Sequence, residues 1–134
     1  MNDRHLFRGK RTDNGEWVTG AYLERYHSTR FGIVDAIFFS DEAKTHRHPV
    51  NRDTVGQCTG MRDNRGLLIF EGDALRRSGK KSKIYIVCWN EYYWVLRCGS
   101  VSENLLMNRG GIDGQEIIGN IHDKPELLEA GDIL

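Results

Sequence analysis

The stretch that decides the fold is residues 83–98, KIYIVCWNEYYWVLRC. β-Branched and aromatic residues fill both halves of it, and the polar pair Asn90-Glu91 separates them, which is the pattern of an antiparallel β-hairpin. A two-residue loop at Asn90-Glu91 would place Val87 opposite Trp94. A four-residue loop would slide this pairing but leave the same residues on each face of the hairpin.

Both faces of the predicted hairpin are largely apolar, so we expect it to lie in the middle of a sheet that is covered on both sides. One face carries Tyr85, Val87, Trp89, Tyr92, Trp94 and Leu96, and the other carries Ile84, Ile86, Cys88, Tyr93, Val95 and Arg97. From the first face, and from the strand pattern around Trp17, the predicted core residues are Trp17, Tyr85, Val87, Trp89, Trp94 and Leu96.

Short apolar runs separated by glycine continue in both directions along the chain, which predicts an all-β fold with one or two short helical turns. A strand with one buried face is predicted from apolar residues at spacing two, namely Phe31, Ile33, Ile37 and Phe39. The polar stretch 40–48 predicts a loop. The other predicted strands cover residues 16–23, 51–59, 67–70, 74–77 and 115–121, and the predicted helical turns cover 102–107 and 123–129.

The length and composition fit one domain of ordinary size. The chain has 134 residues, of which 39% are hydrophobic and 28% are charged, so its core needs neither a disulfide nor a metal. No apolar run approaches the roughly 20 residues of a spanning helix, so we expect no membrane association. Three cysteines without a C-x-x-C motif favour a reducing compartment, so we expect a cytoplasmic protein.

Motifs along nearly the whole chain resemble the YopX family of small bacterial and prophage-encoded proteins. The matching segments are Phe7-Arg8-Gly9-Lys10, Gly15-Glu16-Trp17-Val18, Asp53-Thr54-Val55-Gly56-Gln57, Thr59-Gly60-Met61, Phe70-Glu71-Gly72-Asp73, Ile118-Gly119-Asn120-Ile121 and Pro125-Glu126-Leu127-Leu128. The resemblance implies a small barrel of SH3-like shape in the C-terminal part, and it brings no catalytic or binding residues with it. We therefore expect a single YopX-like domain over 1–134, with an N-terminal β part at about 1–65 and a C-terminal barrel part at about 66–134.

A polar set in the most family-specific segments is a candidate enzyme site. Its members are Gln57, Thr59, Glu71 and Asp73. Paired carboxylates serve general acid–base chemistry when one pKa is shifted in a cleft, so an enzyme would be a small hydrolase that uses Glu71, Asp73 and a histidine. The competing interpretation, which we favour, is that the glycines supply positive φ at strand junctions and that Thr59, Asp63 and Asp73 hydrogen-bond the backbone of turns.

Three further features carry alternatives. Asp35 interrupts an apolar strand. If it points inward, its burial requires a partner or a raised pKa; the interpretation that we favour is that a bulge or a strand edge lets it reach water. His46 and His48 would share a face of an extended segment, but no cysteine or carboxylate pair completes a metal site at a familiar spacing, and we interpret them as solvated loop residues. Cys88 and Cys98 lie within apolar runs on opposite faces and should be unreactive. We predict no catalytic residue, no metal and no cofactor.

Charge is balanced overall but uneven along the chain. Nineteen Lys and Arg residues match nineteen Asp and Glu residues, so the whole protein has no net attraction for nucleic acid. A basic turn with exposed aromatic residues beside it would still bind single strands. The candidate nucleic-acid-binding residues are Arg76, Arg77, Lys80, Lys81, Lys83, Tyr92 and Tyr93. The alternative, which we favour, is that the lysines only solvate a turn.

These observations favour a non-enzymatic binding or adaptor module of mobile-element origin that acts through its β-sheet surface. Its partner would be a protein or, weakly, a nucleic acid, and a homo-oligomer is also compatible with the sequence. The alternative is the small hydrolase. A deep pocket lined by Glu71, Asp73 and a histidine would favour the enzyme, whereas an exposed aromatic or charged surface would favour the binding module.

Overall fold

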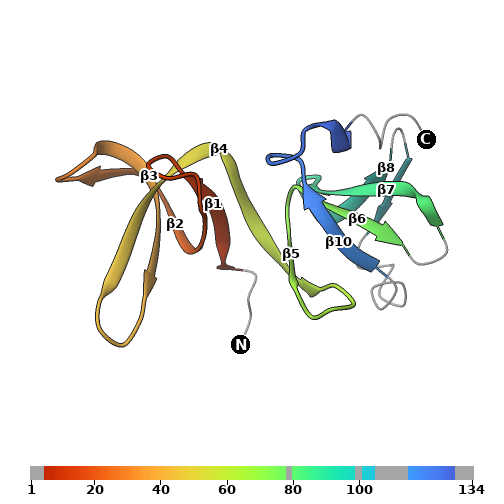
Figure 1. The fold of residues 1–134 in the computed structure, drawn as a ribbon, viewed down its shortest axis with the longest axis horizontal. Coiled ribbons are helices and arrows are strands. Elements are labelled where there is room, and N and C mark those ends of the chain that lie inside the picture. The colour runs from red at the N-terminus through yellow and green to blue at the C-terminus, as the bar shows by residue number, and fades with distance from the viewer. Residues whose placement is uncertain (1–4, 78–79, 99–100, 105–114, 129–134) are drawn as a thin grey trace. The chain divides into compact units, whose positions relative to one another are not determined.

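The computed structural model describes residues 5–77, 80–98, 101–104 and 115–128, and it is mostly β, as predicted (Figure 1). The side chains of 77, 80–82 and 101–104 lie outside this description. Within the described residues α-helix is limited to the turn at 126–128, and no helix there has the length and hydropathy needed to cross a membrane. The chain divides into two compact units, Met1–Cys58 and Thr59–Leu134.

The first unit is a meander of β1 (Phe7–Arg11), β2 (Trp17–Ser28), β3 (Gly32–Ser40) and β4 (Thr45–Arg62), whose last residues continue into the second unit. Consecutive strands pair antiparallel, and β1 also pairs with β4. Gly20 of β2 has no room for a side chain, because its Cβ would collide with the carbonyl oxygen of Phe38 on β3. The buried apolar residues of this unit include Ala36, Ile37, Val50 and Cys58.

Two sequence predictions for the first unit are wrong. The predicted loop at 40–48 ends early, because β4 pairs with β3 from Thr45 onward. The hydrogen-bond ladder forms there whatever the polarity of the side chains, and polarity alone had indicated a loop. The predicted buried face of β3 places only Ile37 in the core. Its other members lie beside the turns at the two ends of the strand and are exposed, namely Phe31, Ile33 and Phe39.

The second unit contains β5 (Leu68–Phe70), β6 (Asp73–Arg77), β7 (Lys80–Trp89), β8 (Trp94–Cys98), β9 (Val101–Asn104) and β10 (Gln115–Asn120). Five of them form one antiparallel sheet in the order β10-β6-β7-β8-β9, so the predicted β7–β8 hairpin is central. One face of the sheet packs around Leu75 and Leu96, and the other packs around Ile86 and Leu127. Both faces are therefore covered, as the sequence predicts.

The β7–β8 hairpin has a four-residue loop, residues 90–93. Trp89 pairs with Trp94, so the pairing predicted from a two-residue loop is wrong by two positions. The reason is the Asn90 side chain, whose oxygen accepts the backbone N–H of Tyr93 at 3.1 Å and holds the wider loop. The assignment of residues to the two faces is unchanged, because a shift of two preserves the alternation of a strand.

Two of the six predicted core residues are not buried. Trp94 is 7% exposed, but Trp89 is 47% exposed because it lies on the last rung of the ladder, beside the loop. Trp17 is only half-buried, and the guanidinium of Arg8 lies 5.0 Å from its ring centroid. The other predicted core residues are buried, namely Tyr85, Val87, Trp94 and Leu96.

Candidate functional site

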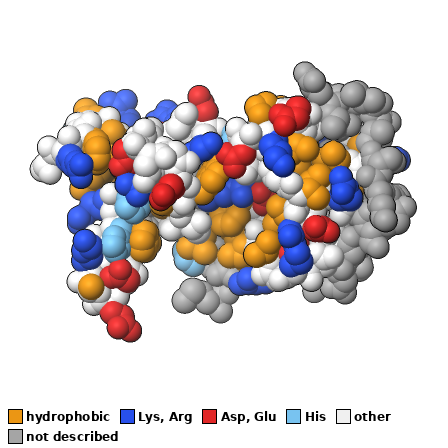
Figure 2. Space-filling model, in the orientation of Figure 1, with side chains coloured by type: hydrophobic (Ala, Val, Ile, Leu, Met, Phe, Trp, Pro, Cys, Tyr) orange, Lys and Arg blue, Asp and Glu red, His pale blue; other side chains and the backbone are white. Residues whose placement is uncertain are grey.

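The basic residues predicted to bind nucleic acid lie around the β6–β7 connection, and we call residues 76–83 the basic turn. Arg76 and Lys83 have exposed side chains. Arg77, Lys80 and Lys81 are strand residues whose side chains lie outside the described ones. On the face shown in Figure 2, the described Lys and Arg side chains are interspersed with acidic and apolar ones and do not form one large patch.

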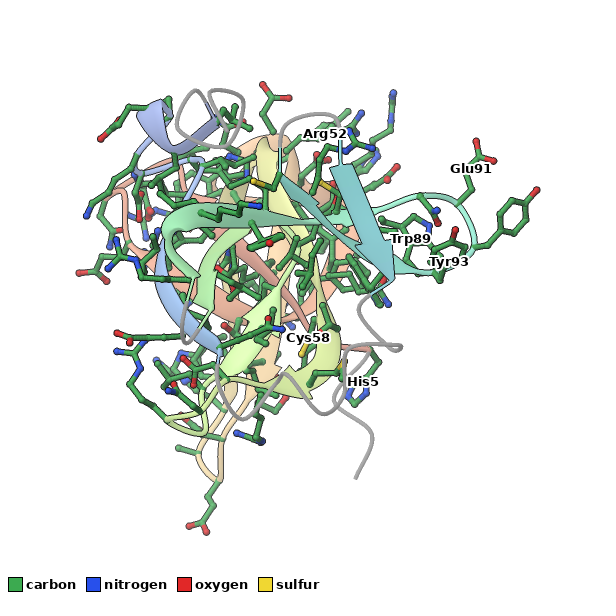
Figure 3. The ribbon with its side chains drawn as sticks, turned by 90° about the vertical axis from the view of Figure 1, so that its right-hand side faces the viewer. His5, Arg52, Cys58, Trp89, Glu91 and Tyr93 are labelled. Atoms are coloured by element: carbon green, nitrogen blue, oxygen red, sulfur yellow. The ribbon has the colours of Figure 1, made fainter. Side chains whose placement is uncertain are left out.

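The end of the β7–β8 hairpin exposes three aromatic residues, Trp89, Tyr92 and Tyr93, which we call the aromatic tip. Tyr92 is 81% exposed, and the other two are exposed to lesser degrees. Trp89 lies edge-on against the buried Trp94, with ring centroids 4.9 Å apart, so one side of its indole is held in place. Figure 3 shows Trp89 and Tyr93 near Glu91 at this end of the hairpin.

The loop that carries the aromatic tip is ordered and has little charge. The side-chain oxygen of Asn90 accepts the backbone N–H groups of Tyr92 and Tyr93, at 3.4 and 3.1 Å. Glu91 has a φ of 87°, a conformation that side chains rarely adopt, and it is the only charged residue among 89–93. An ordered aromatic surface of this kind suits apolar contacts.

The aromatic tip and the basic turn lie at opposite ends of β7. Lys83 is near the start of the strand and Trp89 is its last residue. Six residues of extended chain span about 20 Å. The structure therefore does not bring Tyr92 and Tyr93 beside the basic residues with which the sequence had grouped them.

Two of the four residues proposed for a hydrolase site, Thr59 and Asp73, form hydrogen bonds with the backbone. Asp73 is buried, and its Oδ2 accepts the backbone N–H of Phe70 at 2.7 Å. The buried hydroxyl of Thr59 donates to the carbonyl oxygen of Ile69 at 2.8 Å. The first of these hydrogen bonds supports the interpretation of Asp73 as a residue that fixes a turn, whereas Thr59 joins β4 to β5. The histidine nearest this turn among the described contacts is His122, whose Nε2 would lie 3.3 Å from a Cβ at Gly72.

Asp35 has a charged partner and little access to water, because its side chain is only 9% exposed. Its carboxylate pairs with the Arg52 guanidinium at 2.6 Å and also accepts the Tyr22 hydroxyl and the Arg25 backbone N–H, each at 3.0 Å. The Arg52 hydrogen bond is the main reason that the pKa of Asp35 lies well below its ordinary value. A β-bulge also lies opposite, immediately before Tyr26 of β2.

The histidine pair lies in a strand and not in a solvated loop. His46 and His48 share one face of β4, and the His46 ring stacks on Phe39 with centroids 4.5 Å apart. The His46 Nε2 lies 2.6 Å from a carboxylate oxygen of Asp41. Among the residues that the structure describes, no group of three or more His, Cys, Asp or Glu is placed to hold a metal ion.

The cysteines occupy the faces predicted for them. Cys98 packs in the cluster around Leu75, whereas Cys88 packs against the cluster around Ile86 on the opposite face. Burial raises the pKa of the Cys88 thiol, which makes the thiolate less available.

A hollow of about 200 Å³ in the first unit was not predicted from the sequence. Its lining includes Tyr26, Arg30, Phe31 and Arg47. These residues come from β2, β4 and the β2–β3 turn, and no short motif joins them. The alternation of β2 would also place Tyr26 on the wrong face, because the bulge before it changes the register.

Comparison with known proteins identifies the family. The family model described as YopX protein matches residues 6–129. The chain belongs to the YopX family. The crystal structure of protein EF1440 from Enterococcus faecalis is similar to this YopX-family chain, with 21% sequence identity, a TM-score of 0.53, and coverage of 91% of this chain and 96% of that chain. At that identity the likeness concerns the fold alone. No curated protein matches the chain.

Proposed function

We propose that this member of the YopX family is a non-enzymatic binding or adaptor module, and that it binds a protein partner through the aromatic tip. The observation that carries this conclusion is the exposure of Trp89, Tyr92 and Tyr93 at one end of the central hairpin. Trp and Tyr dominate the energetics of protein interfaces, because each buries a large apolar surface and loses few rotamers. Trp89 is already held against Trp94, so little order is lost when a partner covers it.

A protein with an apolar pocket suits the aromatic tip better than a nucleic acid does. Aromatic residues that stack on bases work beside cations that bind the phosphates. The charge within this loop is Glu91, which repels phosphate. The basic turn is at the other end of β7, about 20 Å of extended chain away. We therefore expect a partner surface that is apolar at its centre and neutral or basic where it faces Glu91.

A pull-down from a lysate of the source organism tests this function, with and without nuclease. The bait proteins are the wild type and the double variant Tyr92→Ser/Tyr93→Ser. We expect a protein that survives nuclease treatment and is lost with the double variant. Leu67→Ser is the matched control, because Leu67 is an exposed apolar residue outside the aromatic tip, and it should retain the partner. Capture that disappears with nuclease, or that is equal for both baits, contradicts the proposal.

Weak nucleic-acid binding by the basic turn is the second candidate function, and the exposed side chains of Arg76 and Lys83 support it. The test is titration of a labelled single-stranded oligonucleotide at about 50 mM salt, where phosphate contacts are strong. Neutralising Lys80 and Lys81 should reduce the slope of log affinity against log salt by roughly one to two units, because each phosphate contact on a single strand contributes about 0.7. The absence of binding at tens of micromolar protein removes this candidate.

The small hydrolase that would use Glu71, Asp73 and a histidine has less support. The Asp73 carboxylate is buried and accepts a backbone N–H, so it is committed to the turn that contains it. A general acid or base must instead reach a reacting group.

We also propose a cytoplasmic location, a prophage origin and a C-terminal part that resembles an SH3-like barrel. The antiparallel order β10-β6-β7-β8-β9, in which the last strand returns to pair with β6, supports the barrel-like shape. Three cysteines without a C-x-x-C motif support the reducing compartment.

A further inference from the structure

The hollow of the first unit lies on one face of the sheet made by β2, β3 and β4. Tyr26 pairs with Val34, and Ala36 pairs with Pro49, so these four lining residues share a face. Ala36 and Pro49 are buried and form its apolar floor. The volume of about 200 Å³ is smaller than the pockets that enclose drug-sized ligands and fits one ring and a small charged group.

Two arginines line this hollow, and neither has an acidic partner among the described residues. The Arg30 guanidinium, in the β2–β3 turn, lies 5.0 Å from the Phe31 ring centroid, and that of Arg47, in β4, lies 5.6 Å from the Phe38 ring centroid. No Asp or Glu is among the lining residues. Because each guanidinium is placed over a ring, its N–H groups remain available to bind an anion in the hollow.

The turn that carries Arg30 is ordered before any ligand binds. The hydroxyl oxygen of Ser28 accepts the backbone N–H groups of Arg30 and Phe31, at 3.1 and 3.0 Å. Gly32, with a φ of 78°, completes the turn in a conformation that suits glycine. The entropic cost of placing Arg30 at a ligand is therefore reduced.

Tyr26 faces the hollow because a bulge in β2 turns it there. The pairing of β2 with β3 shifts between Leu23 and Tyr26, and Arg25 has a φ of 53° in the bulge. The Arg25 backbone N–H donates to Asp35 at 3.0 Å, which fixes this conformation. Without the extra residue, the alternation of the strand would turn Tyr26 to the opposite face.

We propose that this hollow binds a phosphate monoester that carries a flat ring. The phosphate is held between Arg30 and Arg47, since the planar fork of a guanidinium matches phosphate oxygens in pairs. The ring lies on the floor of Ala36 and Pro49, beside the Tyr26 side chain. This site belongs to the first unit and goes beyond the function proposed for the aromatic tip of the second.

Titration of the full chain with phenyl phosphate, followed by calorimetry, tests the site. We expect saturable binding that weakens roughly tenfold or more in Arg30→Gln and in Arg47→Gln, the effect of losing one charge-assisted hydrogen bond. Arg97→Gln is the matched control, because Arg97 is an exposed arginine of the second unit and its loss changes the net charge equally. It should bind as tightly as the wild type.

Two more ligands identify the source of the phosphate. A nucleoside monophosphate that binds more tightly than phenyl phosphate assigns the site to nucleotides, and the reverse order assigns it to aryl phosphates. Inorganic phosphate that binds as tightly as phenyl phosphate contradicts the ring contact. No binding of phenyl phosphate at millimolar concentrations, or equal affinity in wild type and Arg30→Gln/Arg47→Gln, overturns the proposal. The Tyr92→Ser/Tyr93→Ser protein should bind phenyl phosphate normally, so the two proposals can fail separately.

Discussion

The two units of the chain are stabilised by different interactions. In Thr59–Leu134 the described core is built from large apolar side chains, with Leu75, Val87 and Leu96 on one face of a five-stranded sheet. Among the described residues of Met1–Cys58 the buried apolar side chains are few and mostly small, and the Asp35 carboxylate joins β2, β3 and β4 through charged and neutral hydrogen bonds. A sheet can thus be held by apolar burial or by its hydrogen-bond ladder together with a polar centre.

The difference matters for function because it decides what each unit exposes. The second unit buries Phe70, Tyr85 and Trp94, and its exposed aromatic residues lie together at the end of one hairpin. The first unit leaves Phe31, Ile33 and Phe39 exposed, and it arranges arginines over rings at its surface. The two units therefore offer different chemistry to partners: an apolar surface in one and a cationic hollow in the other.

The largest loss of stability should come from substitution in the pair of tryptophans that contact each other in the second unit, Trp89 and Trp94. Trp94→Ala should lower the free energy of unfolding by about 3–5 kcal/mol, as for other buried aromatic residues. Trp89→Ala should cost only roughly 1 kcal/mol, mainly its ring contact with Trp94. Urea denaturation measures both. Equal costs would mean that Trp89 is as buried as Trp94 and would remove the aromatic tip.

The next largest loss of stability should come from a substitution in the first unit that creates a clash with the backbone. Gly20→Ala should cost about 3 kcal/mol, at the upper end for overpacked sites, because the added methyl meets the backbone of Phe38. Gly15→Ala is the control: its φ of 76° is strained for alanine, but the space around it is open, so about 1 kcal/mol is expected. If the two variants unfold at the same urea concentration, β2 and β3 do not approach as closely as described.

The stability that Asp35 gives to the first unit should depend on pH. Asp35→Asn should cost roughly 1–3 kcal/mol at neutral pH, because it removes the charge that binds Arg52. The folded-state pKa of Asp35 is lowered, so its stabilising contribution is present above the ordinary carboxyl pKa of about 3.9 and is lost as pH falls towards the folded value. Unfolding of wild type and variant should therefore converge below about pH 4.

The control for this pH dependence is Asp13→Asn. Asp13 also pairs with an arginine, Arg11, at 2.7 Å, but the pair is solvated and should contribute little to stability. A difference between wild type and Asp35→Asn that does not change with pH would show that Asp35 acts through its shape and not through its charge.

The smallest expected effect is a gain in stability. Glu91→Gly should raise the free energy of unfolding by about 0.5 kcal/mol, because glycine adopts the φ of 87° without strain but loses more chain entropy on folding. Thermal unfolding of the variant measures the change. A lower melting temperature would indicate that the Glu91 side chain makes contacts that outweigh the strain.

The fold of the second unit could be predicted from residues 83–98, because burial on both faces of a central hairpin leaves a continuous apolar pattern. Its register could not be predicted, since it depends on the backbone hydrogen bonds that the Asn90 side-chain oxygen accepts and on the positive φ of Glu91. The first unit was harder, because polar residues such as Thr45 form strands when a neighbouring strand satisfies their backbone groups.

The candidate sites could be predicted only in part. Tyr92 and Tyr93 stand out in the sequence, but the length of β7 separates them from the basic turn, and strand length is not visible in composition. Arg30 and Arg47 lie on different segments, and the bulge at Arg25 decides what faces them. Arg30 and Arg47 line the same hollow because of the way β2, β3 and β4 pair, and the alternation of residues along one strand does not predict that pairing.

The buried cysteines make it possible to measure how often each unit opens. Cys58 is enclosed in the first unit and Cys98 in the second. A buried thiol reacts with an alkylating reagent only while its surroundings are open, so the rate of modification at each site reports how often that unit opens. Once the half-buried Cys88 is replaced by alanine, each unit retains one such thiol. Mass spectrometry of a single sample would then measure the two alkylation rates separately. A ligand that binds one unit should lower the alkylation rate of the thiol in that unit only.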